Sequence, residues 1–150
     1  MLKENGRLGI VLSNPILSIK KYANVRKWLM SVLRIVAIFN LPPNVFAETG
    51  VNTSMLVAYK QKTERLEELK KANYSVFAKD IQNVGYEKRT SKRNVVFNPL
   101  YKTDDVTFEF AIDNNGEMII NEEFSSIIKE FRQWCATQEE EIVTFMLVMT

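Results

Sequence analysis

The sequence predicts a single α/β domain, and three observations support this class. The chain has 150 residues, 46% hydrophobic and 25% charged, so it can bury a core of ordinary size. Three short apolar runs, Arg7–Leu12, Leu33–Phe39 and Ser54–Tyr59, are typical of buried strands in a parallel sheet. A helical pattern separates the first two runs. This order predicts a strand–helix–strand unit whose third strand pairs beside the second, with an antiparallel pairing left open.

The helical pattern lies in the segment Ser18–Val32. Its apolar residues recur at spacings of three and four, which places them on one face of an amphipathic helix. These residues are Tyr22, Val25, Leu29 and Val32. The cations between them then face solvent. Before this helix, Asn14-Pro15 ends the first strand, and after the second strand a loop at 40–53 contains Pro42, Pro43 and Gly50.

The second half of the chain predicts further elements. Residues 61–72 form an exposed helix with Leu66 and Leu69 as its anchors, and the Asn-Gly pair in Asp113–Gly116 predicts a β-hairpin. The other predictions are a strand at 74–81, a basic loop at 83–98, and a helix at 124–134 with Ile127, Ile128, Phe131 and Trp134 on one side and Ser125 or Ser126 as its cap.

The C-terminal residues 139–150 leave two interpretations open. Their apolar end is either a strand or a segment that continues in a longer protein, and the acidic run Glu139–Glu141 before it is interpreted as solvated. Cys135 is interpreted as a packing residue because no base stands beside it in the sequence.

The composition excludes several kinds of site. Without histidine and with one cysteine, the chain can build neither a Ser–His or Cys–His nucleophile nor a thiolate zinc site, so no metal site is expected. GxxxxGK[ST] and GxGxxG motifs are missing. The single cysteine, the lack of a secretory signal and the lack of a 20-residue apolar run predict a cytoplasmic protein without a membrane segment. The net charge of +2 gives no argument for nucleic acid by itself.

Three segments resemble the modification subunits of type I restriction–modification systems, which are N-6 adenine DNA methylases. The strongest is LRIVAIFNLPPNVFAETGVNTSMLVAYK at 33–60. The family there has an aliphatic strand, Leu-Pro, Phe, Thr-Gly-Val, Thr-Ser, and a second strand ending in Lys. The other two are GRLGIVLSNPIL at 6–17 and a Gly-Tyr-acid-Lys-Arg turn at 84–89. The resemblance runs in order over most of the chain.

The resemblance implies a fold and an activity. The fold is α/β: the C-terminal part of a Rossmann-like methyltransferase sheet at 1–60, with a small antiparallel extension at 61–150, as one structural unit. The intact parent would transfer a methyl group from S-adenosylmethionine to adenine N-6 in DNA. Its partners would be DNA, the specificity and restriction subunits of the same system, and the N-terminal half of the methyltransferase domain.

Two family motifs are missing from this sequence: the Gly-rich loop that binds S-adenosylmethionine and the Asn-Pro-Pro-aromatic motif that holds the adenine. Asn14-Pro15-Ile16 lacks the second proline and the aromatic, and Leu41-Pro42-Pro43-Asn44 lacks an Asn before its prolines. We therefore expect a fragment that is inactive alone, with no catalytic or cofactor-binding residue. The alternative is a stand-alone, non-enzymatic interaction module or a degenerate methylase remnant. A remnant would dimerise or aggregate through its exposed sheet edge unless a partner covers that edge.

Four residues are candidates for contact with the target base or with DNA: Phe46, Thr53, Lys88 and Arg89. A loop aromatic such as Phe46 can stack on a flipped base, although packing at the sheet edge is the commoner role. Thr53 can reach the base pocket or bond its own backbone. Lys88 and Arg89, with two further cations at 92 and 93, either neutralise phosphates or face solvent in a loop.

Overall fold

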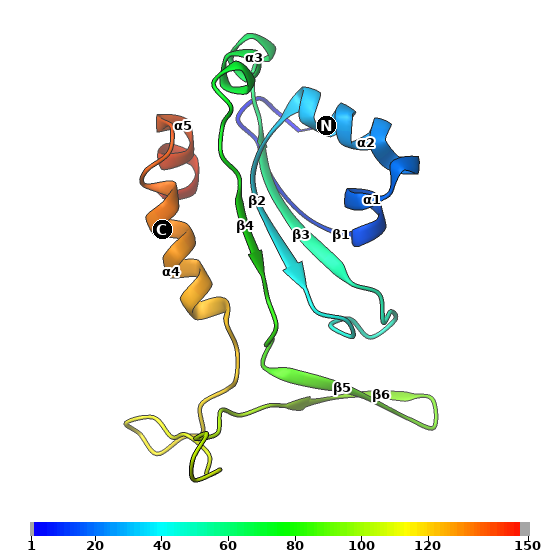
Figure 1. The fold of residues 1–150 in the computed structure, drawn as a ribbon, viewed down its shortest axis with the longest axis vertical. Coiled ribbons are helices and arrows are strands. Elements are labelled where there is room, and N and C mark those ends of the chain that lie inside the picture. Colours follow the sequence, from blue (N-terminus) through cyan, green and yellow to red (C-terminus); the bar gives the residue numbers. More distant parts are fainter. Residues whose placement is uncertain (1, 148–150) are drawn as a thin grey trace.

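The computed structural model describes residues 2–147 and contains one mixed four-stranded sheet (Figure 1). Its order is β1-β3-β2-β4; β3 is antiparallel to both neighbours and β4 is parallel to β2. The predicted α/β class is confirmed, and so is the third strand beside the second; their pairing, which the sequence left open, is antiparallel. The strands of this sheet are β1 (Arg7–Ser13), β2 (Leu33–Leu41), β3 (Thr53–Lys60) and β4 (Phe77–Asp80).

The helices lie along and beside this sheet, and a separate two-stranded hairpin runs off from its base (Figure 1). The hairpin consists of β5 (Tyr86–Ser91) and β6 (Asn94–Pro99). The helical elements are α1 (Asn14–Ser18), η1 (Lys20–Tyr22), α2 (Ala23–Val32), α3 (Thr63–Lys71), α4 (Phe124–Cys135), α5 (Glu140–Ile142) and the π-helical turn η2 (Val143–Leu147).

Strand β2 is the buried centre of the sheet. Val36 and Ala37 have no exposed surface, as expected for a strand with a neighbour on each side and cover on both faces. On one face, Leu33 and Ile35 pack with Leu29 and Val32 of α2. On the other face, Phe39 packs against α4.

Strand β1 corrects the prediction of a strand buried in a parallel sheet. It pairs antiparallel with β3 and lies at the sheet edge, where Ile10 and Val11 are 39% and 45% exposed. An apolar run favours burial without fixing its neighbours, and here β3 inserts between β1 and β2.

The helix predicted at 18–32 is divided. Pro15 stands in the first turn of α1, Ile19 adopts an extended conformation with ψ 138°, and α2 begins only at Ala23. Leu29 and Val32 face the core as predicted, whereas Val25 is 44% exposed. The extended residue at position 19 ends α1 and separates it from the helical turns that follow, so one continuous helix does not run from 18 to 32.

Helix α4 covers the second face of the sheet with an aromatic cluster. Phe131 lies with ring centroids 5.8 Å from Phe39 and 5.3 Å from Phe77, and Trp134 lies 5.6 Å from Phe77. Two details of the predicted helix are wrong. Ile128 is 49% exposed, because only Ile127 of this pair points to the sheet. The residue at the N-cap is Glu123. The Ser126 hydroxyl donates to the backbone carbonyl of Glu123 and does not cap the helix.

The prediction of a loop at 83–98 is wrong, because β5 and β6 pair there as an antiparallel hairpin. The hairpin predicted around Asp113–Gly116 is found only as a turn. The Asp113 N–H donates to the Glu117 carbonyl and Gly116 has a φ of +83°, but the flanking residues form isolated bridges such as Ile112↔Met118. The helix at 61–72 is confirmed as α3, with Leu66 and Leu69 buried.

Candidate functional site: the carboxyl edge of the sheet

Three strands end at the same edge of the sheet. Strands β1 and β2 are both antiparallel to β3, and β4 is parallel to β2, so all three run in one direction. Ligands of open α/β sheets bind beyond such carboxyl ends. Each of these strands carries an amide or carboxylate side chain there: Asn14 directly after β1, Asn40 in β2 and Asp80 in β4.

A chain of hydrogen bonds joins these groups across all four strands. The Ser54 hydroxyl of β3 is 1% exposed and lies 2.7 Å from both Asn14 Oδ1 and Asn40 Oδ1. Asn40 Nδ2 donates to Asp80 Oδ1 at 2.6 Å. Because a hydroxyl has a single proton, Ser54 donates to one amide oxygen at a time. At any moment the Ser54 hydroxyl therefore holds either Asn14 or Asn40, while Asn40 stays bonded to Asp80 at the rim of the edge.

Two adjoining hollows open beside this chain. One has a volume of about 230 Å³ and is lined by Asn14, Asn40 and Asp80 together with residues of the 42–52 loop. The second, of about 250 Å³, is lined by that loop and by Tyr86, Glu87 and Lys88 of β5. Pro42, Pro43 and Gln82 line both hollows. The stiff Pro42-Pro43 pair thus forms the wall between them.

Strand β5 holds the 42–52 loop at this edge. The Lys88 ammonium donates to the carbonyls of Phe46 and Thr49 at 2.9 and 3.2 Å, and the Tyr86 hydroxyl donates to the Val45 carbonyl at 2.9 Å. Val45 anchors the loop in the core, and the next residue, Phe46, is 39% exposed. The structure therefore brings Phe46 and Lys88 together.

The other two predicted site residues lie apart from this pair. Thr53 is the first residue of β3 and is 7% exposed, and its Oγ1 has no hydrogen-bond partner among residues 2–147. Arg89 lies on β5 and pairs with Glu87 at 2.6 Å. Sequence reasoning missed Asn14, Asn40, Ser54 and Asp80. Polar residues at the ends of predicted strands would have pointed to them.

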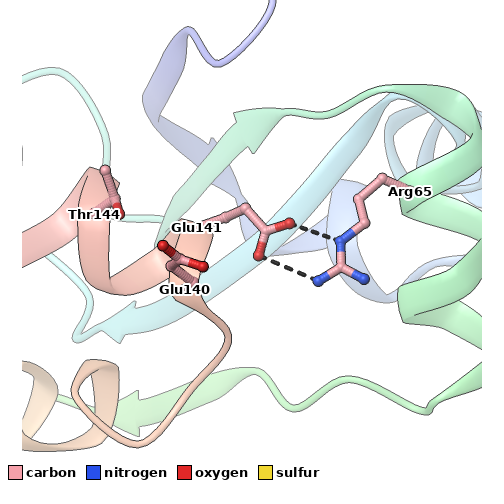
Figure 2. A pocket seen from close by; sticks show the side chains of 4 residues that line it. All are labelled: Arg65, Glu140, Glu141 and Thr144. Atoms are coloured by element: carbon pink, nitrogen blue, oxygen red, sulfur yellow. Dashed lines mark hydrogen bonds and ion pairs between the residues drawn. The ribbon is translucent and has the colours of Figure 1, made fainter.

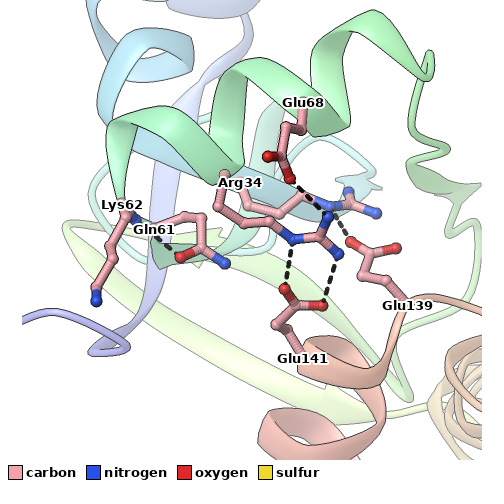
Figure 3. Close-up of polar contacts among 7 residues, drawn as sticks. Arg34, Gln61, Lys62, Glu68, Glu139 and Glu141 are labelled. Carbon is pink, nitrogen blue, oxygen red and sulfur yellow. Dashed lines mark hydrogen bonds and ion pairs between the residues drawn. The ribbon is translucent and has the colours of Figure 1, made fainter.

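A second polar cluster joins the sheet to the C-terminal turn, by which we mean the helical turn that begins at Glu139 and contains α5. Arg34 of β2 has no exposed surface, and its Nε donates to Glu139 Oε1 at 2.6 Å (Figure 3). Its Nη1 donates to the Ser75 carbonyl at 2.8 Å, and its guanidinium carbon lies 4.0 Å from the centre of the Tyr74 ring. Burial, with the nearby Glu139 carboxylate, raises the pKa of Tyr59.

The second ion pair of this cluster belongs to α3. Arg65 donates through Nε and Nη2 to the two oxygens of Glu141, at 2.6 and 3.3 Å (Figure 2). These bonds hold the pKa of Glu141 below its usual range. The pair borders an open hollow of about 340 Å³ that Glu140 and Thr144 also line. The interpretation of Glu139–Glu141 as a solvated run is therefore wrong for Glu139 and Glu141, which are paired to arginines, and it holds only for the exposed Glu140.

Cys135 is buried in the same region, as predicted for a packing residue. Burial raises the pKa of its thiol to about 11, so the thiol stays protonated and unreactive at neutral pH. The ion pairs of Arg34 and Arg65 and the unreactive thiol of Cys135 indicate that this cluster stabilises the fold, and we assign no reaction to it.

The described residues do not fit a S-adenosylmethionine site of the Gly-rich kind. Such a site needs a Gly-rich turn between a strand and the helix that follows it, whereas β1 passes directly into α1 at Asn14-Pro15. The glycines of the chain lie before or inside strands, in the 42–52 loop or in the Gly116 turn. Among residues 2–147, no three His, Cys, Asp or Glu side chains form a group that could hold a metal ion. No helix in this described part is long and apolar enough to cross a membrane.

The sheet and its edge define an α/β protein with a polar hydrogen-bonded chain and two hollows at its strand ends. The model of the family described as N-6 DNA Methylase matches residues 1–144, and the chain belongs to this family. No curated protein matches the sequence. A solved modification subunit assigned to a type I restriction enzyme of Vibrio vulnificus is 15% identical, with a TM-score of 0.34, over 78% of this chain. The match spans 26% of that longer protein.

Proposed function

We propose that this chain is part of the modification subunit of a type I restriction–modification system, and that the complete enzyme methylates adenine N-6 in DNA. The proposal rests on the family membership together with the segment 41–52, which has the family's Leu-Pro, Phe and Thr-Gly-Val pattern and borders both hollows at the strand ends.

In this proposal the loop forms a wall of the target-base pocket. Phe46 would stack on the flipped adenine, since its side chain is 39% exposed and its carbonyl is bonded to Lys88, which lines one of the hollows. Lys88 would act mainly through the loop, because its ammonium is already bonded to the Phe46 and Thr49 carbonyls. Thr53 would line the pocket base, and Arg89 would contact DNA from β5.

We further propose that the methyl donor, S-adenosylmethionine, is bound by a part of the enzyme outside this chain. The residues described here do not fit the cofactor, so we derive no step of the reaction through it. The chain alone would then be inactive, and a calorimetric titration with S-adenosylmethionine should give no saturable heat.

The proposal also divides the chain and names its partners. Residues 1–60 would complete the methyltransferase sheet and 61–150 would extend it, as one unit; the pairing of β4 with β2 supports this. The open edge of β1 would meet the N-terminal half of the domain. DNA and the specificity and restriction subunits would be further partners in the cytoplasm.

A reconstitution tests this function. The purified chain is mixed with a polypeptide that carries the missing Gly-rich loop and Asn-Pro-Pro-aromatic motif, and transfer of labelled methyl groups to DNA adenine is measured. We expect transfer only when both parts are present. Full activity of the partner without this chain would remove the proposed role.

A further inference from the structure

The tip of the β5–β6 hairpin has an unusual conformation for its residues. Ser91 pairs with Asn94, which leaves a two-residue turn of Lys92 and Arg93. Both have positive φ, +51° and +96°. A two-residue turn with two positive φ angles is of type I′, which strongly favours Asn-Gly, because side chains with a Cβ are strained there. This turn therefore has Lys92 and Arg93 at the two positions where Asn-Gly would have less backbone strain.

These two cations are the free ones of the basic segment. Lys88 is bonded to the loop carbonyls and Arg89 to Glu87. Lys92 and Arg93 are exposed, and neither side chain takes part in any hydrogen bond or ion pair found among residues 2–147. Glu87, at the base of the hairpin, is the one carboxylate in residues 86–99. The tip therefore carries two uncompensated positive charges.

The position of the tip favours contact with an extended anion. The hairpin runs away from the base of the sheet, so its tip lies clear of the helices (Figure 1). Ser91 and Asn94, which flank the turn, are exposed and supply further polar groups of the kind that contact phosphates. Residues 101–123 carry seven carboxylates and one lysine, so DNA would be repelled from that segment and drawn to the hairpin.

We propose that Lys92 and Arg93 form a phosphate-binding site that holds the DNA backbone outside the target-base pocket. The proposal rests on the proposed function, because it assumes that DNA is the substrate. It adds a DNA contact at the strained tip of the hairpin to the contact proposed for Arg89 of β5. The strain is then retained because Asn-Gly in the same turn would be relaxed and uncharged.

The turn itself provides the test variant. The double substitution Lys92→Asn and Arg93→Gly creates the preferred type I′ sequence, so the hairpin should fold at least as well while both charges are lost. The matched control is Lys62→Gln with Lys71→Gln, which removes two exposed charges at the ends of α3, away from the hairpin (Figure 1). Binding of the full chain to a labelled duplex is measured by fluorescence anisotropy as a function of salt.

We expect the tip variant to bind roughly tenfold more weakly at low salt, and its slope of log affinity against log salt to fall by about 1.8, from about 0.9 per phosphate contact. Its melting temperature should stay equal or rise, and the control should bind like the unmodified chain. The proposal is overturned if the tip variant binds the duplex as tightly as the unmodified chain, or if the control variant loses as much affinity as the tip variant. It is also overturned if the unmodified chain binds no duplex, or if the unmodified chain binds polyglutamate more tightly than the duplex. A failed reconstitution of methyl transfer with an intact tip effect would instead reject the proposed function alone.

Discussion

The buried Arg34–Glu139 pair gives the sharpest prediction for the fold. Glu139→Gln removes the negative charge but keeps the side-chain size and an oxygen that can accept from Arg34 Nε. The Arg34 guanidinium has no exposed surface and would be left without its counter-ion, although the Ser75 carbonyl and the Tyr74 ring remain beside it.

The size of the effect follows from this burial. Breaking a buried ion pair by removing one partner costs about 3–5 kcal/mol. Because the Glu139 side chain is 15% exposed and glutamine preserves one hydrogen bond, we expect a smaller loss, about 2–3 kcal/mol by the same principle. For a chain of this length that loss lowers the melting temperature by roughly 5–10 °C.

The neighbouring glutamate supplies the control. Glu140→Gln makes the same change of charge one residue away, but Glu140 is exposed and takes part in none of the ion pairs found in residues 2–147. Thermal melting by far-UV circular dichroism compares the two variants at neutral pH. Equal melting temperatures for Glu139→Gln and Glu140→Gln would refute the buried pair, and with it the docking of the C-terminal turn on β2.

Three further predictions concern the site, the surface and the pH dependence. In the reconstituted enzyme, Phe46→Ala should lower methylation roughly 5- to 150-fold, because base stacking contributes about 1–3 kcal/mol, and the melting temperature should change little. A large fall in melting temperature with normal activity per folded molecule would instead show that Phe46 is a core residue. The isolated chain should self-associate in a light-scattering concentration series, because β1 has an open edge and Val106 and Phe108 are 84% and 81% exposed; a monomer at all concentrations would contradict this. Arg65 lowers the folded-state pKa of Glu141, so their pair stabilises the fold above the unfolded carboxyl pKa of about 4.3, and this stabilisation is lost as the pH falls through the lower folded pKa. Glu141→Gln should therefore reduce the acid-induced fall in melting temperature, by a modest amount because Arg65 is 40% exposed. An unchanged dependence of the melting temperature on pH would count against the pair.

The sequence predicted the elements whose evidence is local. Strand β2 follows from a continuous apolar run, and α3 and α4 follow from their periodic anchors. The position of the 42–52 loop at the strand ends also follows, because it connects two predicted strands. The candidate residue Phe46 was found through its resemblance to the family pattern, and its proximity to Lys88 depends on the β5 pairing that the sequence did not predict.

The errors arose where the deciding contact is distant or atypical. The β5–β6 hairpin was missed because its turn contains Lys92 and Arg93 in place of glycine or asparagine. Glu139 and Glu141 were interpreted as solvated because their partners, Arg34 and Arg65, lie 105 and 76 residues away in the chain. The neighbours of an edge strand such as β1 are likewise set by the whole sheet, which no window of sequence contains.

We proposed that this chain is a necessary part of an adenine N-6 DNA methyltransferase, and adenine modification in cells tests this proposal most directly. Genomic DNA is digested to nucleosides, and N-6-methyladenine is quantified by mass spectrometry in the source cells before and after deletion of the segment that encodes residues 1–150. We predict that a site-specific fraction of the methylated adenines disappears on deletion and returns when the chain is supplied again. An unchanged methyladenine content and pattern after deletion would contradict the account.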